Sequence, residues 1–290
     1  MGLTSRVRAW GDAGELIDLG GHRIFVRAQD GEGPPVLFLH GYPSSSYDWR
    51  SVFEGMPGRR IVAFDFLGFG LSDKPRDHRY SLCGQADLAE AIVARYFPGE
   101  PVALIAHDMG TSVTTELLAR DLDRRLPFEL ARVLLFNGSM VIERASLTLD
   151  QKLLRSRLGP IVSRLSNRRG FRRSFGRIFS ASHPLTQEEA DDQWALLEYN
   201  DGNRILDKLI FYLHERVSLG PRWHGALRKW PGRLELAWAC RDPICTEAVL
   251  QAVLSLRPAA PLTRFPPLGH YPQIEDPVGV TAVVDTFVGS

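Results

Sequence analysis

The sequence predicts an α/β protein built on a mostly parallel, doubly wound sheet. Short, continuous apolar runs are typical of strands that are buried on both faces of such a sheet. Five runs have this character: Val36–Leu39, Ile61–Phe64, Val102–Ala106, Val133–Phe136 and Leu234–Ala239. Stretches with helical periodicity separate several of them, for example Gln85–Tyr96 and Thr111–Arg120. This alternation of strand and helix predicts the class.

The two ends of the chain add further elements. Glu15–Leu19 and His22–Ala28 alternate apolar and polar residues and are joined by Gly20-Gly21, a pattern that predicts a β-hairpin with a primed turn. Near the carboxyl end, Thr263–Phe265 is expected to be the last strand and Pro277–Val288 a closing helix.

Residues 139–227 interrupt the alternation, because they show helical patterns and no convincing strand. We therefore expect a helical cap at 139–227, inserted between two parts of the sheet domain at 1–138 and 228–290. Residues 151–187 contain nine Lys or Arg and no acid. Such a run usually marks a solvated helix face, and peripheral contact with lipid headgroups is the alternative.

The composition narrows the function classes. A chain of 290 residues with 44% hydrophobic and 24% charged residues is a folded globular protein that needs no disulfide or metal staple. A net charge of +1 gives no electrostatic case for a nucleic-acid partner. The three cysteines form no C-x-x-C pair and fit a reducing compartment. Without a signal peptide or a long apolar span, we expect a cytoplasmic protein.

The most informative motif is Ala106-His107-Asp108-Met109-Gly110-Thr111. It follows a predicted strand and precedes a predicted helix, and small residues surround its centre. This is the steric requirement of a nucleophile elbow, a tight turn that exposes one strained side chain. The central residue is Asp108, which the start of the helix would favour in its ionised form. The competing interpretation is that Asp108 is an ordinary helix N-cap.

Two further residues favour catalysis. Asp242 follows the Leu234–Ala239 strand, and His270 follows the last predicted strand. The order nucleophile, acid, histidine is that of a known catalytic triad. Each residue also lies at the carboxyl end of a predicted strand, where open α/β sheets place their sites.

Other residues are placed near this centre. The loop His40-Gly41-Tyr42-Pro43 follows the Val36–Leu39 strand. We expect the backbone N–H groups of Tyr42 and Met109 to form an oxyanion hole. Four side chains are expected beside the substrate: His40, Pro43, His107 and Trp194. For His107 a structural hydrogen-bonding role is favoured over that of a second base, and for Trp194 both pocket wall and cap core stay open.

An aspartate nucleophile restricts the chemistry. A carboxylate attacks an electrophilic sp³ carbon and leaves an ester on the enzyme. Water activated by His270 then hydrolyses the ester, while Asp242 orients the imidazole. Epoxides, alkyl halides and strained lactones suit this chemistry, whereas attack on an ordinary ester would give an anhydride.

The motifs HGYPSSSYDWR, DFLGFGLSDKP, HDMG and HYPQIEDP resemble the epoxide hydrolase and haloalkane dehalogenase branch of the α/β-hydrolase superfamily. The likeness is strongest to the mesoderm-specific transcript-like subfamily, and it continues into the cap through Asn200–Asn203 and the Arg222-Trp223 segment. The resemblance covers the chain from about His22 onward. It implies an α/β-hydrolase core with a cap and a triad of Asp108, Asp242 and His270.

The same resemblance bears on the substrate. Haloalkane dehalogenases of the family use an Asn in H-G-N-P and a Trp after the nucleophile to bind the halide, where this chain has Tyr42 and Met109. Family epoxide hydrolases use cap tyrosines as proton donors, and this insertion contains Tyr212 and Tyr199. The favoured function is therefore an epoxide hydrolase that makes a vicinal diol from an apolar epoxide and water, with Tyr212 as the first choice of acid.

Two alternatives remain. Some defluorinating relatives hold fluoride with cap His, Trp and Tyr side chains, and this cap contains His214, Trp194 and Tyr212. A dehalogenase is thus the second choice, and a non-catalytic ligand-binding protein is the third. No cofactor motif and no metal cluster is evident, so we expect neither. The sequence leaves the oligomeric state open.

Overall fold

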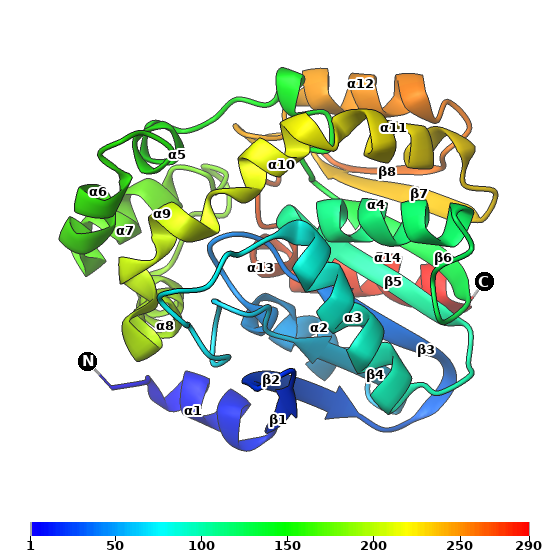
Figure 1. The fold of residues 1–290 in the computed structure, drawn as a ribbon, viewed down its shortest axis with the longest axis horizontal. Coiled ribbons are helices and arrows are strands. Elements are labelled where there is room, and N and C mark those ends of the chain that lie inside the picture. Colours follow the sequence, from blue (N-terminus) through cyan, green and yellow to red (C-terminus); the bar gives the residue numbers. More distant parts are fainter. Residues whose placement is uncertain (1, 290) are drawn as a thin grey trace.

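The computed structural model describes residues 2–289 and contains one sheet of eight strands in the order β1-β2-β4-β3-β5-β6-β7-β8 (Figure 1). β2 pairs antiparallel with β1 and β4, and the remaining pairs are parallel. The strands are β1 (Glu15–Leu19), β2 (His22–Gln29), β3 (Glu32–Leu39), β4 (Arg59–Phe64), β5 (Val102–His107), β6 (Leu130–Phe136), β7 (Arg233–Ala239) and β8 (Leu262–Phe265). The predicted fold class and its strands are confirmed.

Helices cover both faces of the sheet, which explains why the central strands are apolar throughout. The core helices are α1 (Ser5–Asp12), α2 (Arg50–Glu54), α3 (Leu82–Tyr96), α4 (Met109–Leu122), α12 (Glu247–Leu256), α13 (Pro272–Glu275) and α14 (Pro277–Gly289). In β3, Leu37 and Leu39 belong to the core cluster that includes α3 and α4. Val36 and Phe38 belong to the cluster that includes α2 and α14. The two-residue period of a strand thus supplies two cores at once.

Local chemistry explains two details of the strands. Gly20 and Gly21 both have positive φ, as a primed hairpin turn requires. β3 begins earlier than predicted, and its register with β4 shifts between Glu32 and Val36. Pro34 and Pro35 lie in that interval, and proline has no N–H to donate to the neighbouring strand.

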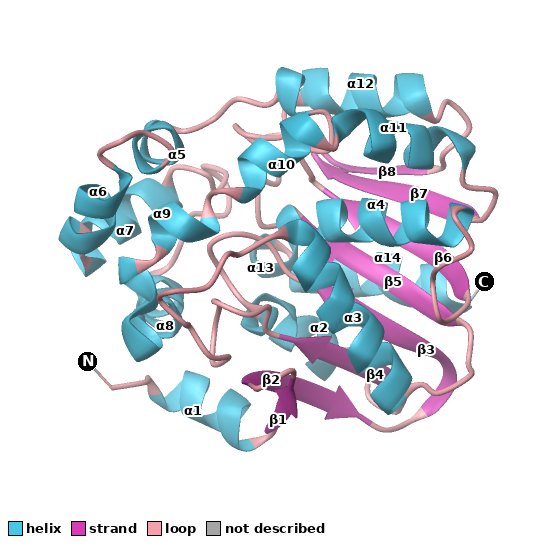
Figure 2. Ribbon diagram, in the orientation of Figure 1, coloured by secondary structure: helices cyan, strands magenta, loops and turns pink. Residues whose placement is uncertain are grey.

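The segment between β6 and β7 contains helices and, within the described residues, no strand (Figure 2). Figure 1 shows α5 to α9 gathered at one end of the molecule, beyond the carboxyl ends of the parallel strands. These helices are α5 (Leu149–Leu154), α6 (Gly159–Leu165), α7 (Arg168–Gly176), α8 (Gln187–Glu198) and α9 (Leu206–Leu209). α10 (Tyr212–Ser218) leads back to the core, and α11 (Gly220–Lys229) packs along α4. The predicted insertion therefore contains two groups of helices: α5 to α9, which gather beyond the sheet, and α10 and α11, which return to the core.

Polar contacts attach α8 to the core. Asp192 accepts hydrogen bonds from the Tyr47 hydroxyl (2.6 Å) and from Arg6 Nε (2.7 Å). Gln193 donates to the buried Asp48 carboxylate (2.8 Å). Because these three partners, Tyr47, Arg6 and Asp48, belong to the core, they hold α8 in place against it. Across residues 2–289, every helix is too short or too polar to cross a bilayer.

Candidate active site

Asp108 forms the strained turn between β5 and α4. Its backbone has φ 43° and ψ −107°, a left-handed value that costs a non-glycine residue about 1–3 kcal/mol. Its side chain makes no capping bond to α4, so it is not an ordinary N-cap. A Cβ at Gly110 would lie 2.8 Å from the carbonyl oxygens of Leu39 and His40, so only glycine lets α4 start this close to β3.

The loop after β3 holds the Asp108 carboxylate. The backbone N–H of Tyr42 donates to Asp108 Oδ2 (3.0 Å). Gly41 permits this approach, because a Cβ there would lie 2.9 Å from the Asp108 Cβ. Met109 is the first residue of α4, where backbone N–H groups have no partner within the helix. Tyr42 therefore already donates at the position expected of an oxyanion-hole amide.

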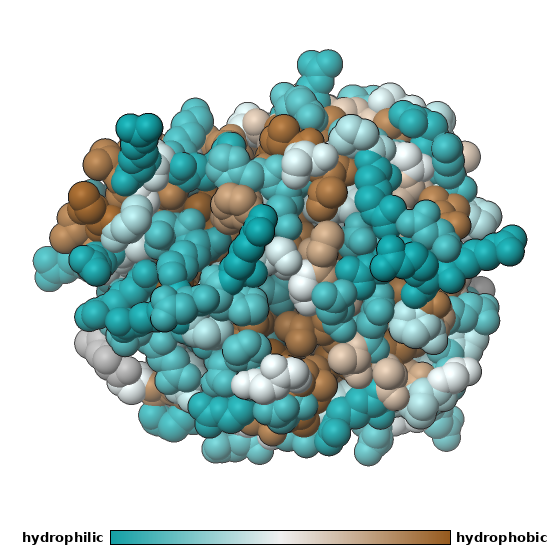
Figure 3. Space-filling model, in the orientation of Figure 1, coloured by the Kyte–Doolittle hydropathy of each residue, from teal (hydrophilic) through white to brown (hydrophobic). Residues whose placement is uncertain are grey.

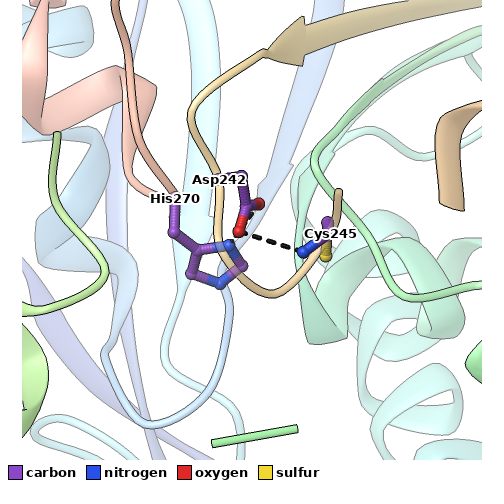
Figure 4. Close-up of side chains that lie close together, drawn as sticks. All are labelled: Asp242, Cys245 and His270. Carbon is purple, nitrogen blue, oxygen red and sulfur yellow. Dashed lines mark hydrogen bonds and ion pairs between the residues drawn. The ribbon is translucent and has the colours of Figure 1, made fainter. Parts of the chain in front are cut away.

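His270 and Asp242 form a buried pair beside this turn. His270 Nδ1 lies 2.7 Å from Asp242 Oδ2, and the other carboxylate oxygen accepts a hydrogen bond from the Cys245 amide (3.0 Å) (Figure 4). The same oxygen accepts a hydrogen bond from the Ile244 amide (2.7 Å). Asn137 also donates to Asp242 Oδ2 (2.9 Å). The bond at Nδ1 places the second ring nitrogen, Nε2, where it can take a proton.

The electrostatics of the pair suit a proton acceptor. Burial alone would lower the pKa of His270, but the charge and hydrogen bond of Asp242 raise it above its ordinary value. Burial alone would raise the pKa of Asp242, but His270 and the two backbone amides lower it. Asp242 is thus ionised, and it stabilises the imidazolium that forms when His270 takes a proton.

Cys245 lies close to the same pair, and ligand atoms of Asp242, Cys245 and His270 are within 4.8 Å of one another. Burial raises the pKa of the Cys245 thiol well above its usual value, and its sulfur lies 3.2 Å from Ser139 Oγ. Metal ligation needs a thiolate, whereas this environment keeps the thiol protonated. His270 Nδ1 and Asp242 are already bonded to each other, so the donor set fits proton transfer better than a metal.

Arg216, on α10, contacts Asp108, and the sequence pattern did not assign it a role. It is 1% exposed, its Nη2 lies 3.5 Å from Asp108 Oδ1, and the same nitrogen donates to the Asp108 carbonyl oxygen (3.1 Å). Its Nε donates to Ser112 on α4 (2.8 Å). The signal was its spacing, because Arg216 lies four residues after Tyr212 and so shares its helix face.

The structure brings Tyr212 to the site but not Tyr199. The Tyr212 ring is 5.5 Å from that of Tyr42 and 4.6 Å from the Arg216 guanidinium. Burial, and then the charge of Asp108, raise the pKa of Tyr212 well above its usual value, so its hydroxyl stays protonated. Tyr199 instead lies over the Lys74 ammonium (5.1 Å) and packs against the core cluster of α2 and α14.

His40 and His107 are buried and bonded to backbone groups. His40 contacts the Gly41 carbonyl through Nδ1 (2.8 Å) and accepts the Phe66 amide at Nε2 (3.0 Å). His107 Nε2 contacts the carbonyl of His270 (2.7 Å). Burial lowers the pKa of His40 to about 3 and that of His107 to about 4, so both are neutral. With their ring nitrogens occupied, both brace the loops that carry Tyr42 and His270.

A cavity of about 510 Å³ lies between the cap and the site. Its wall is mostly apolar, and Trp194, Pro43 and Tyr42 are part of it. Tyr42 connects the cavity to Asp108, because it lines the cavity and its backbone amide donates to the Asp108 carboxylate. One candidate of the dehalogenase alternative lies elsewhere, because the His214 side chain is exposed to solvent.

Comparisons with known proteins agree with this architecture. The sequence profile of a family described as "alpha/beta hydrolase fold" matches residues 34–277. A Mycobacterium tuberculosis protein named "Putative hydrolase LipZ" is 56% identical over 93% of this chain and 94% of its own length. The mouse mesoderm-specific transcript protein is 34% identical over 99% of this chain and 89% of its own. A haloalkane dehalogenase of Agrobacterium fabrum is 33% identical over 40% of this chain and 38% of its own.

Solved structures show the same fold. Haloalkane dehalogenase DatA from Agrobacterium tumefaciens C58 superposes with a TM-score of 0.76, at 21% identity, over 97% of this chain and 98% of that one. An α/β hydrolase fold protein from Burkholderia ambifaria gives a TM-score of 0.74, also at 21% identity, over 93% and 98%. The resemblance that the sequence motifs indicated is confirmed.

Proposed function

Since this chain belongs to the α/β hydrolase fold family, we propose that it is a hydrolase that opens an apolar epoxide to a vicinal diol through an ester on Asp108. The observation that carries the proposal is the residue at the elbow. A carboxylate stands there, its Oδ2 bound by the Tyr42 amide, in a site that also holds the buried His270–Asp242 pair. Carboxylates attack sp³ carbon, and the cavity beside the site is mostly apolar.

The first step forms the ester. A carboxylate oxygen of Asp108 attacks an epoxide carbon, the carbon–oxygen bond of the ring breaks, and the ring oxygen leaves as an alkoxide on the same molecule. The Tyr212 hydroxyl supplies the proton to that oxygen. General acid help of this kind contributes roughly 10²–10⁴ in rate.

The second step cleaves the ester. His270 Nε2 takes a proton from water, and the hydroxide adds to the Asp108 carbonyl carbon. The resulting oxyanion accepts hydrogen bonds from the backbone N–H groups of Tyr42 and Met109. Collapse releases the diol and restores the Asp108 carboxylate, and the proton on His270 returns to the Tyr212 phenolate. The balance is one epoxide plus one water to one diol.

Dehalogenation is the second candidate, and one contact favours it. Arg216 places guanidinium N–H groups beside Asp108, and such donors could bind a departing halide. Haloalkane dehalogenases are also among the relatives. Against it stand Tyr42 and Met109, whose side chains are not N–H donors.

Trapping the covalent ester on Asp108 would distinguish epoxide hydrolysis from dehalogenation. In His270→Gln the attack on substrate remains and the hydrolysis of the ester is blocked. Intact mass is measured after incubation with a set of epoxides and then with a set of haloalkanes. A gain equal to a whole epoxide, mapped to Asp108 by peptide sequencing, supports the proposal. A gain equal to the alkyl group alone, with haloalkanes only, supports the dehalogenase. No adduct from either set would contradict both.

Tyr212→Phe should lower the rate of epoxide opening about 10²-fold or more, because the phenol no longer donates to the ring oxygen. Ester formation is followed by rapid-quench mass measurement. Tyr199→Phe provides a matched comparison, since the place of that residue over Lys74 predicts little change. Equal losses in both variants would contradict the assignment of Tyr212.

The pH dependence of ester hydrolysis should depend on Asp242. His270 must be neutral to accept a proton, and its pKa is raised, so the hydrolysis rate should rise with pH through a value above the ordinary 6.5. In Asp242→Asn the effect of burial is no longer opposed by the carboxylate, so the pKa of His270 falls. The rise of the hydrolysis rate with pH should then occur at lower pH, and the maximal rate should fall about 10²-fold or more. Single-turnover decay of the ester measures both. An acid limb that stays in place would show that another group titrates.

A further inference from the structure

The outer face of the cap carries exposed apolar side chains close in sequence to a run of cations. Four of the nine large apolar side chains that are exposed in residues 2–289 lie between 149 and 165: Leu149, Leu158, Ile161 and Leu165. Leu158, Ile161 and Leu165 are spaced as one face of α6, and they are 54%, 56% and 71% exposed. Figure 3 shows apolar side chains at the end of the molecule where Figure 1 places α5 and α6.

The same segment of the cap is rich in cations. Residues 151–187 hold nine of the 35 Lys and Arg residues and none of the 34 acids, so the remainder of the chain is net acidic. Within the part of the chain that the structure describes, Arg168 is the member of this group that pairs with a carboxylate, that of Asp191. Arg164, Arg169 and Arg172 are exposed and lie on α6 and α7. Clustered cations create a local positive potential that attracts anionic partners.

We propose that this face, made of the exposed apolar residues of α5 to α6 and the cations of α6 and α7, docks on an anionic lipid bilayer. An amphipathic helix at a membrane buries its apolar face at the headgroup boundary while Lys and Arg contact anionic lipids. A solvated helix face explains the cations but not the apolar stripe. A nucleic acid would likewise use the cations and leave the apolar stripe without a role.

The cavity strengthens the choice of a lipid surface. Leu165 belongs both to the exposed stripe and to the cavity wall, and Asn167 and Gly170 are exposed residues of the same wall. The cavity that ends at Tyr42 therefore reaches the surface on the docking face. An apolar substrate dissolved in the bilayer would enter it without crossing water.

Vesicle cosedimentation of the full chain tests the docking. The vesicles are phosphatidylcholine alone, or phosphatidylcholine with about a third of phosphatidylglycerol. We expect partition onto the anionic vesicles that is lost near 1 M salt, where the Debye length is about 3 Å. Arg164→Gln/Arg169→Gln/Arg172→Gln should lower the partition coefficient about 100-fold, at about fivefold for each cation. Leu158→Ser/Ile161→Ser should lower it about tenfold or more.

Two controls carry matched changes away from the cap. Arg228→Gln/Lys229→Gln alters two exposed cations at the end of α11, and Val278→Ser alters an apolar side chain of α14 that is 80% exposed. Both should bind as the unaltered chain does, and circular dichroism should show all variants folded.

Three results would overturn the proposal. These are no partition onto anionic vesicles, equal partition onto neutral ones, or equal losses in the controls. A single-stranded oligonucleotide is tested alongside, and binding to it that needs the arginines but not Leu158 and Ile161, with no vesicle binding, would assign the face to nucleic acid. The assay contains no substrate, so its outcome is independent of the reaction proposed above.

Discussion

Asp108→Asn should abolish ester formation and lower turnover by about 10⁴-fold or more, because an amide oxygen is a poor nucleophile toward sp³ carbon. Asn has the same shape, and its side-chain oxygen can still accept the Tyr42 amide that now bonds Oδ2. The backbone at this position already holds a non-glycine residue at positive φ, and Asn has the same branching as the Asp that it replaces. The variant should therefore fold, although with a lower free energy of unfolding because Arg216 loses its buried anion, and its loss of turnover should be chemical. Steady-state turnover of Asp108→Asn, and the intact-mass assay with Asp108→Asn added to the His270→Gln variant, measure it.

The matched control is Asp123→Asn, which removes a carboxylate just past the other end of the same helix. Asp123 pairs with Arg222 on the surface, where such pairs contribute little to stability. That variant should retain the turnover of the unaltered chain. An Asp108→Asn protein that still gains the mass of a substrate would place the nucleophile elsewhere.

The elbow could be predicted because its cause is local. The tight turn requires small residues such as Gly110 around Asp108, and this requirement can be recognised within six consecutive residues of the sequence. The central strands could also be predicted, since a strand that is buried on both faces of the sheet must be apolar throughout. Asp242 and His270 were found together because parallel strands bring their carboxyl ends to one edge of the sheet, and the structure places them 2.7 Å apart.

Side chains of the insertion were harder to place, because no repeating element fixes their direction. Tyr199 precedes Asn200 and Asp201, which both have positive φ. This double turn directs the chain in a way that composition does not reveal, and the Tyr199 ring meets Lys74 instead of the cavity. Asn137 was missed for a related reason. It follows β6 with a φ of 27° and bonds Asp242, but a single Asn after a strand usually marks only a turn.

Arg216 shows most clearly what sequence reasoning lacked, and replacing it should have the second large effect. In Arg216→Met the Asp108 carboxylate, which is 3% exposed, loses its buried cation. Breaking one partner of a buried ion pair costs about 3–5 kcal/mol of stability. Turnover should fall as well, because Arg216 also holds the Asp108 carbonyl and Ser112 in place. Urea unfolding and single-turnover ester formation measure the two effects.

A double-mutant cycle separates the ion pair from simple packing. Asp108→Asn leaves Arg216 buried without its anion, and Arg216→Met leaves Asp108 without its cation, so each single change carries the desolvation cost of the charge that remains. The double variant carries neither. Its free energy of unfolding should therefore exceed the value expected from adding the two losses, by about 1–3 kcal/mol. Additive losses would mean that Arg216 acts through its bonds to Ser112 and the backbone. The cycle needs no substrate, so it tests the electrostatic coupling between Asp108 and Arg216 independently of the proposed reaction.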